Sequence, residues 1–304
     1  MFSRLNSKDS PYTIADFLEL ECIKAGTEIS SLSYRSYMSV SDDEIDNNGM
    51  ESSDDKSIVK LDAAIAECSN RLNCCPIQYP FIIGNSSLGL KPDSSWHRDI
   101  YIFLLLTTRL NMRDEHVQDE LNGTKLFETL CSLVIKEYYG KHCRAEVFGT
   151  STSGSFKDKV DGLLKALCIK GHVKEPEGTT GRQKDGNLDI VAWIPFSDKK
   201  DGQLIAMGQC KTGTHWETLL PELDPDNFFA LYSSQQPYSR PQKLFFVSES
   251  FGDYKWGERC ASVGILFDRT RIMEYLPENM DEELLSKIIK WNKAALVKIA
   301  QRIR

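Results

Sequence analysis

The chain has 304 residues, enough for one or two domains and a large hydrophobic core. Apolar residues make up 41% and charged residues 27%, as in ordinary globular proteins, and residues 1–95 account for the whole net charge of −7. This acidic balance argues against an avid, freely acting nucleic-acid binder, which would carry an excess of basic residues.

The nine cysteines are odd in number and include no Cys-x-x-Cys pair, which favours a reducing, cytoplasmic setting over a disulfide framework. Cys74, Cys75 and His97 are a candidate zinc set, although they lack the usual ligand spacing. We see no secretory signal, and the longest apolar run, residues 100–108, is too short to span a bilayer. We therefore expect a cytoplasmic protein that does not act at a membrane.

The first third of the chain is predicted to be a mainly helical region, residues 1–112. Apolar residues at helical spacing predict helices over 11–26, 57–73 and 96–110, with an extended segment at 79–84. The acidic stretch 41–55 is predicted to be a solvated loop, and a DNA-mimicking or partner-binding patch is the alternative. Because this region carries no recognisable chemical motif, we expect it to bind a partner, to sense or to assemble.

Residues 113–304 are predicted to form a second domain, which opens with a helix over 114–139. Thr124 is the expected N-cap of this helix and Gly140 its stop. Glu128 lies beside the apolar stripe of the helix, and Glu137 is the competing candidate for a functional acid.

A strand at 144–149 and an inserted helix at 156–169 are expected next. In the polar loop that follows, Arg182 and Lys184 could contact phosphate, and two solvated basic side chains are an equally good interpretation.

The most informative stretch is residues 186–213, two apolar strands joined by a charged turn that ends in Asp-Gly. If the hairpin folds about Lys199, Asp189 and Gln209 lie opposite each other at its open end. Lys211 shares a face with Gln209 because side chains two apart on a strand point the same way.

An acid, an amide oxygen and an ammonium would then meet at one place. Carboxylate and amide oxygens suit Mg²⁺, and an ammonium can orient water and offset phosphate charge. A solvated hairpin end with a Lys–Asp pair is the alternative.

Beyond the hairpin, His215 could contact phosphate or act as an acid, although a structural role is commoner for a lone histidine near a strand end. Apolar runs then predict a helix at 228–232, strands at 243–248 and 264–268, and a C-terminal amphipathic helix at 281–303.

The placement of Asp189 on one strand and Gln209-x-Lys211 on the next resembles the PD-(D/E)xK nuclease superfamily, and Gln-x-Lys is most similar to its Mrr-like branch. Leu188 stands where the motif has proline, and Gln209 stands for the commoner glutamate, which removes one negative charge. The resemblance implies a restriction-endonuclease-like αβββαβ core, that is, an α/β fold with a mixed central sheet flanked by helices.

The resemblance also implies a site and an activity. Glu128, Asp189, Gln209 and the Cys210 carbonyl would hold Mg²⁺, with Mn²⁺ as a substitute, and Lys211 would orient or deprotonate the attacking water. The implied function is a DNA endonuclease of prokaryotic restriction or antiphage defence.

An ATPase, helicase or sensor is the expected partner, through the N-terminal region, and homo-oligomerisation is a further option. The alternative function is a catalytically inactive nucleic-acid-binding or regulatory module on the same fold.

Overall fold

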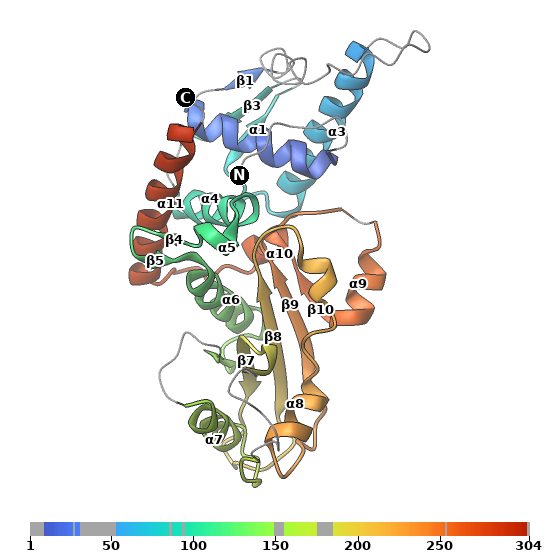
Figure 1. The fold of residues 1–304 in the computed structure, drawn as a ribbon, viewed down its shortest axis with the longest axis vertical. Coiled ribbons are helices and arrows are strands. Elements are labelled where there is room, and N and C mark those ends of the chain that lie inside the picture. The colour runs from blue at the N-terminus through green and yellow to red at the C-terminus, as the bar shows by residue number, and fades with distance from the viewer. Residues whose placement is uncertain are drawn as a thin grey trace.

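The centre of the molecule is a five-stranded mixed sheet with the order β10-β9-β8-β7-β6 (Figure 1). The computed structural model describes residues 9–26, 28–30, 53–84, 87–92, 95–148, 155–174, 185–252 and 254–302. The sheet strands are β6 (Arg144–Val147), β7 (Ile190–Ile194), β8 (Leu204–Lys211), β9 (Gln242–Val247) and β10 (Ile265–Phe267). The first three strands are antiparallel neighbours, whereas β8, β9 and β10 run parallel.

Helices cover both faces of this sheet, and strand alternation decides which side chains each face receives. On β7, Ile190 and Ala192 join the larger core beneath α6, whereas Val191 and Trp193 join a second core on the opposite face. Buried side chains of two helices, α7 and α8, complete that second core. The helices are α6 (Gly123–Tyr139), α7 (Phe156–Ala166) and α8 (Pro225–Tyr232).

The N-terminal region adds helices and a small antiparallel sheet beyond the C-terminal ends of β8, β9 and β10 (Figure 1). Its elements are α1 (Pro11–Ala25), β1 (Ile29–Ser30), α3 (Ser53–Cys74), β2 (Phe81–Ile83), β3 (Ser87–Leu90) and α4 (Trp96–Arg109). The remaining helices are α5 (Met112–Glu115), α9 (Trp256–Val263), α10 (Arg269–Glu274) and α11 (Glu282–Arg302). The mainly helical character that the sequence predicts for this region is therefore confirmed.

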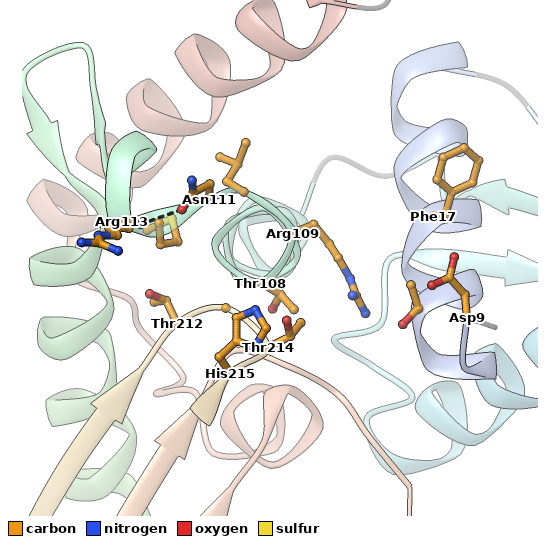
Figure 2. A pocket seen from close by; sticks show the side chains of 13 residues that line it. Asp9, Phe17, Thr108, Arg109, Asn111, Arg113, Thr212, Thr214 and His215 are labelled. Atoms are coloured by element: carbon orange, nitrogen blue, oxygen red, sulfur yellow. Dashed lines mark hydrogen bonds between the residues drawn. The ribbon is translucent and has the colours of Figure 1, made fainter. Parts of the chain in front are cut away.

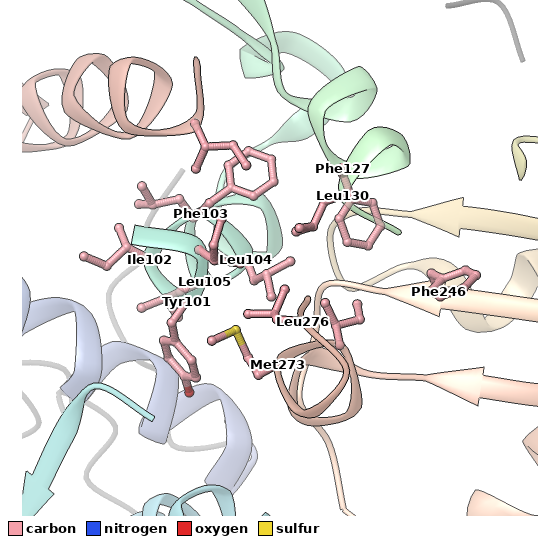
Figure 3. Close-up of a cluster of buried hydrophobic side chains, with 14 of the residues drawn as sticks. Tyr101, Ile102, Phe103, Leu104, Leu105, Phe127, Leu130, Phe246, Met273 and Leu276 are labelled. Atoms are coloured by element: carbon pink, nitrogen blue, oxygen red, sulfur yellow. The ribbon is translucent and has the colours of Figure 1, made fainter. Parts of the chain in front are cut away.

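One hydrophobic core joins the N-terminal region to the sheet (Figure 3). Its centre is α4, in which residues 100–106 are all buried, as expected of a helix that is apolar on every side. Side chains of α4 lie close to Met273 and Leu276 on one side and to Phe127 and Leu130 of α6 on another. The division of the chain at residue 112 stays a prediction, since this core runs across it.

The helix predicted over 114–139 is wrong at its N-terminal end, because α6 begins at Gly123. Before it, Asp119 and Glu120 have positive φ values of 48° and 66° and turn the chain between two short strands. These strands are β4 (Val117–Gln118) and β5 (Leu121–Asn122). Thr124 is also not the N-cap. Asn122 is, because its side-chain oxygen accepts from the backbone N–H groups of residues 124 and 125.

Candidate functional site

The β7–β8 hairpin has the register that the sequence predicts. Ile190 pairs with Gly208 and Ile194 with Leu204, which places the fold of the hairpin at Lys199. Lys199 itself has a positive φ of 54°, as turn residues often do. One further step along the register sets Asp189 opposite Gln209, and the Asp189 N–H donates to the Gly208 carbonyl at 3.0 Å.

Gln209 and Lys211 share the carboxylate of Glu222. Gln209 Nε2 and Lys211 Nζ each donate to Glu222 Oε2 at 2.9 Å. Glu222 lies in the loop after the 3₁₀ turn η2 (Trp216–Leu219), and its carbonyl accepts from Asn187 Nδ2 at 3.3 Å. An amide, an ammonium and a carboxylate therefore meet beside the C-terminal end of β8.

Gln209 is fully buried, and its amide can face only one way. A carboxylate accepts hydrogen bonds and donates none, so the nitrogen of Gln209 must face Glu222. Its oxygen, Oε1, is then buried and has no hydrogen-bond partner among the described residues. A buried acceptor left unsatisfied costs about 1–3 kcal/mol, so this oxygen is the atom of the site most in need of a ligand.

Asp189 and Glu128 lie near the thiols of the buried Cys131 and the half-buried Cys210, on the α6 side of β8. Asp189 Oδ2 accepts from the Cys210 N–H at 2.7 Å. Burial raises the pKa of the Cys210 thiol well above its usual value, and the contact with Cys131 and the charges of Asp189 and Glu128 raise it further. Both carboxylates are thus close enough to the Cys210 thiol to raise its pKa. Glu137, the competing candidate on α6, is exposed instead.

Alternation along β8 decides which of its side chains face α6. Cys210 packs against the core beneath α6, and Gln209 points to the opposite face, as alternation along a strand requires. The acid that contacts both Gln209 and Lys211 is consequently Glu222, which sequence reasoning did not identify. Glu222 lies in an irregular loop, where no periodicity indicates where a side chain points.

The other predicted phosphate contacts lie apart from this cluster. His215 is exposed, just before η2, and lines a groove at the end of β8 (Figure 2). Arg182 and Lys184 lie outside the described residues, as does most of the acidic stretch 41–55.

The sequence also raised two further questions, whether Cys74, Cys75 and His97 bind zinc and whether any segment could span a membrane. In the described part of the chain, no group of three or more His, Cys, Asp or Glu side chains could hold a metal ion, which includes the candidate zinc set. His97 instead stacks on Trp96 and bonds to Ser95. None of the helices in the described ranges has both the length and the apolar character needed to cross a bilayer.

The expected Mg²⁺ ligands are a different set, two carboxylates with an amide and a backbone oxygen. Such hard oxygens fit a magnesium ion that keeps several of its waters. The unsatisfied Oε1 of Gln209 is consistent with this assignment.

No protein-family model, curated protein or solved structure matches the chain, so its function is inferred from its own residues.

Proposed function

We propose that the chain is a metal-dependent DNA endonuclease of the PD-(D/E)xK superfamily. One observation carries the proposal: Gln209 is buried with an unsatisfied oxygen, opposite Asp189, and is coupled through Glu222 to Lys211. A lysine and hard oxygen donors at one strand end are the combination that phosphodiester hydrolysis requires.

The arrangement of elements supports the same proposal. In chain order, α6 precedes the antiparallel strands β6, β7 and β8, and α8 precedes β9, which pairs parallel with β8. This is the order helix, three strands, helix, strand that a restriction-endonuclease-like core would have, with α7 as an insertion.

The residues of the chain would divide the chemistry as follows. Glu128, Asp189, Gln209 Oε1 and the Cys210 carbonyl would hold Mg²⁺, which when bound lowers the pKa of its water and neutralises phosphate charge. Lys211 donates one N–H to Glu222 and has two more with which to hold a water or a phosphate oxygen.

Glu222 keeps the amide of Gln209 turned so that its oxygen faces away from the ion pair. Glu222 also supplies a negative charge, which the site lacks at position 209 because that residue is glutamine instead of the commoner glutamate.

The wider role that we propose is prokaryotic restriction or antiphage defence, with a protein partner bound through residues 1–112. The second candidate is an inactive nucleic-acid-binding or regulatory module. The observation that favours it is the 2.9 Å ion pair of Lys211 with Glu222, which satisfies the lysine inside the protein as a purely structural pair would.

The test is cleavage of plasmid and linear DNA with Mg²⁺, Mn²⁺ or EDTA by the wild type, Lys211→Ala and Lys200→Ala. Lys200 is the matched control, since its side chain is 81% exposed in the turn of the same hairpin. We expect metal-dependent cleavage that falls about 100-fold or more in Lys211→Ala and is unchanged in Lys200→Ala.

Two results would contradict the proposal. If Lys211→Ala cleaves DNA as fast as the wild type, the catalytic site does not lie at the β7–β8 hairpin. If the wild type binds DNA but does not cleave it, even when the products of neighbouring genes are added, the result supports the inactive module.

A further inference from the structure

A groove of about 640 Å³ lies at the C-terminal end of β8, between that strand, α4 and α1 (Figure 2). Its walls come from residues 9–17, 108–113 and 212–215. It begins one residue after Lys211, yet no residue of the proposed nuclease site lines it. Its volume is within the range of small-molecule sites.

The groove holds several hydrogen-bond donors that the protein does not use. The side chains of Arg113, Thr212, Thr214 and His215 make no hydrogen bond with another described residue. In Figure 2, Thr212, Thr214 and His215 lie together at the end of the strand, and Arg113 lies on the same side as Thr212. Four such donors around one space favour a ligand rich in acceptor atoms.

The charge of the lining also favours an anion. Arg109 and Arg113 contribute two guanidinium groups against the single carboxylate of Asp9. Arg109 is tethered, because its Nε donates to Asp16 at 2.6 Å, and its side chain is 13% exposed. Because Arg109 also lies 3.8 Å from Glu249, acidic groups of the protein already compensate its charge, and Arg113 is the guanidinium of the lining that is left for an anion.

The floor of the groove is fixed to the sheet and to α4. Gly213 N–H donates to the Thr107 carbonyl at 3.0 Å, and Ser248 N–H donates to the Lys211 carbonyl at 3.3 Å. The parallel strands β8, β9 and β10 end on this side, where open α/β sheets commonly bind ligands. Phe17, which is half-buried on α1, adds apolar surface that a planar ring could cover.

We propose that this groove binds a phosphate-bearing ligand of nucleotide size. Arg113, His215 and the hydroxyl groups of Thr212 and Thr214 would donate to the phosphate, and the ring of Phe17 would pack against the base. The phosphate belongs either to a free nucleotide or to a nucleic-acid strand that enters the groove. The proposal does not depend on nuclease activity, since it concerns binding alone.

The test is isothermal titration calorimetry of the full chain in EDTA, which keeps divalent metal and cleavage out of the measurement. Inorganic phosphate, AMP and a short single-stranded thymidine oligonucleotide are the three probes. The variants are Arg113→Gln and Thr214→Val, both exposed, and Arg144→Gln is the control at an exposed arginine of β6. We expect each groove variant to weaken binding about tenfold, the effect of losing a charge-assisted hydrogen bond, and the control to bind as the wild type does.

The probes separate the two sources of phosphate. Binding of phosphate or AMP that the groove variants weaken supports a free nucleotide. Binding of the oligonucleotide alone, weakened in the same variants, supports a nucleic-acid strand. The proposal is overturned if no probe binds at millimolar concentration, or if Arg113→Gln and Thr214→Val bind as tightly as Arg144→Gln.

Discussion

Gln209 occupies a position where a single atom changes the electrostatics of the site. Its nitrogen bonds to Glu222, and its oxygen is buried without a partner in the described part of the chain. A glutamate in its place would set two carboxylates in contact, next to one lysine. The amide therefore donates a hydrogen bond to Glu222 where a second carboxylate would repel it, and it leaves an oxygen for a cation.

We predict that Gln209→Glu destabilises the protein at pH 7 by about 1–3 kcal/mol, because a buried hydrogen bond becomes a repulsive contact. The neighbouring charge and burial would raise the pKa of the new carboxyl above its unfolded value. The cost is then present at neutral pH and disappears as the pH falls through the raised pKa and the group becomes protonated.

Urea unfolding of both proteins between pH 7 and pH 4 measures this change, with and without Mg²⁺. If Gln209 is a metal ligand, Mg²⁺ stabilises the Gln209→Glu protein more than the wild type, because a second carboxylate strengthens the site. An equal effect of Mg²⁺ on the two proteins would count against a metal at this position. This readout is independent of DNA cleavage.

At the scale of elements, the start of α6 is fixed by its contact with α11. A Cβ on Gly123 would lie 2.8 Å from Trp291 Cζ2, and the indole cannot easily move because its Nε1 donates to the His116 carbonyl at 3.1 Å. Glycine thus lets two helices of the core approach closely, and α6 carries Glu128 at the next turn. The position of a candidate site residue depends on this contact.

We predict that Gly123→Ala destabilises the protein by about 1–3 kcal/mol, the usual cost of overpacking a core. The matched control is Gly162→Ala in α7, where an added Cβ meets no atom within 4 Å. That change should stabilise the protein by about 0.5–1 kcal/mol, because alanine favours a helix over glycine. Thermal unfolding of the two variants measures both changes in stability. A Gly123→Ala protein more stable than the wild type would show that the Trp291 indole can move to make room for the added methyl group.

The elements that could be predicted are those set by local sequence signals, and the ones that could not depend on tertiary contacts. The hairpin register followed from two apolar strands and an Asp-Gly turn, which are local signals that the structure confirms. The turn at Asp119 and Glu120 interrupts an expected helix. It could not be predicted, because residues other than glycine rarely adopt a positive φ and nothing in their sequence indicates one. The position of Glu222 depended on a loop packed over the sheet, a tertiary contact that no local pattern encodes.

At the scale of the whole molecule, buried charges connect the N-terminal region to the end of the sheet. Asp16 on α1 is fully buried and forms ion pairs with Arg71 of α3, Arg109 of α4 and Arg269 of α10. Arg269 is itself fully buried, which hydrophobic patterns could not anticipate for a charged residue. This network and the shared core explain why four helices far apart in sequence pack as one unit.

We predict that Asp16→Asn destabilises the protein by about 3–5 kcal/mol, because it removes the carboxylate that pairs with all three guanidinium groups and leaves Glu19 and Glu67 to compensate the buried Arg71 and Arg269. The control is Asp226→Asn, which breaks an ion pair of the same 2.8 Å length with Arg240 on the surface. Exposed pairs contribute at most about 1 kcal/mol, so this variant should unfold almost as the wild type does. Comparable losses in the two variants would mean that the network contributes no more than a surface pair.

The same network gives the stability a definite dependence on pH. Burial raises the pKa of Asp16, but Arg109, Arg269 and Arg71 outweigh it and hold the pKa well below its usual value. A lowered carboxyl pKa stabilises the fold above the unfolded pKa near 4, and this contribution is lost as the pH falls towards the folded pKa. At Glu249 and Asp268 burial prevails over the neighbouring positive charges and hydrogen bonds and raises the pKa values, so the wild-type curve alone mixes both signs.

Most of that mixture cancels in the difference between the wild type and Asp16→Asn, because the raised groups are present in both proteins and burial, more than the charge of Asp16, raises the pKa of Glu249. This difference should be constant from pH 7 to about pH 5 and then shrink below the unfolded pKa by up to about 1.4 kcal/mol per pH unit, one proton's worth. Urea unfolding at each pH gives the two free energies. A difference that stays constant down to pH 3 would mean that Asp16 keeps its ordinary pKa. The three guanidinium groups would then not be stabilising its charge.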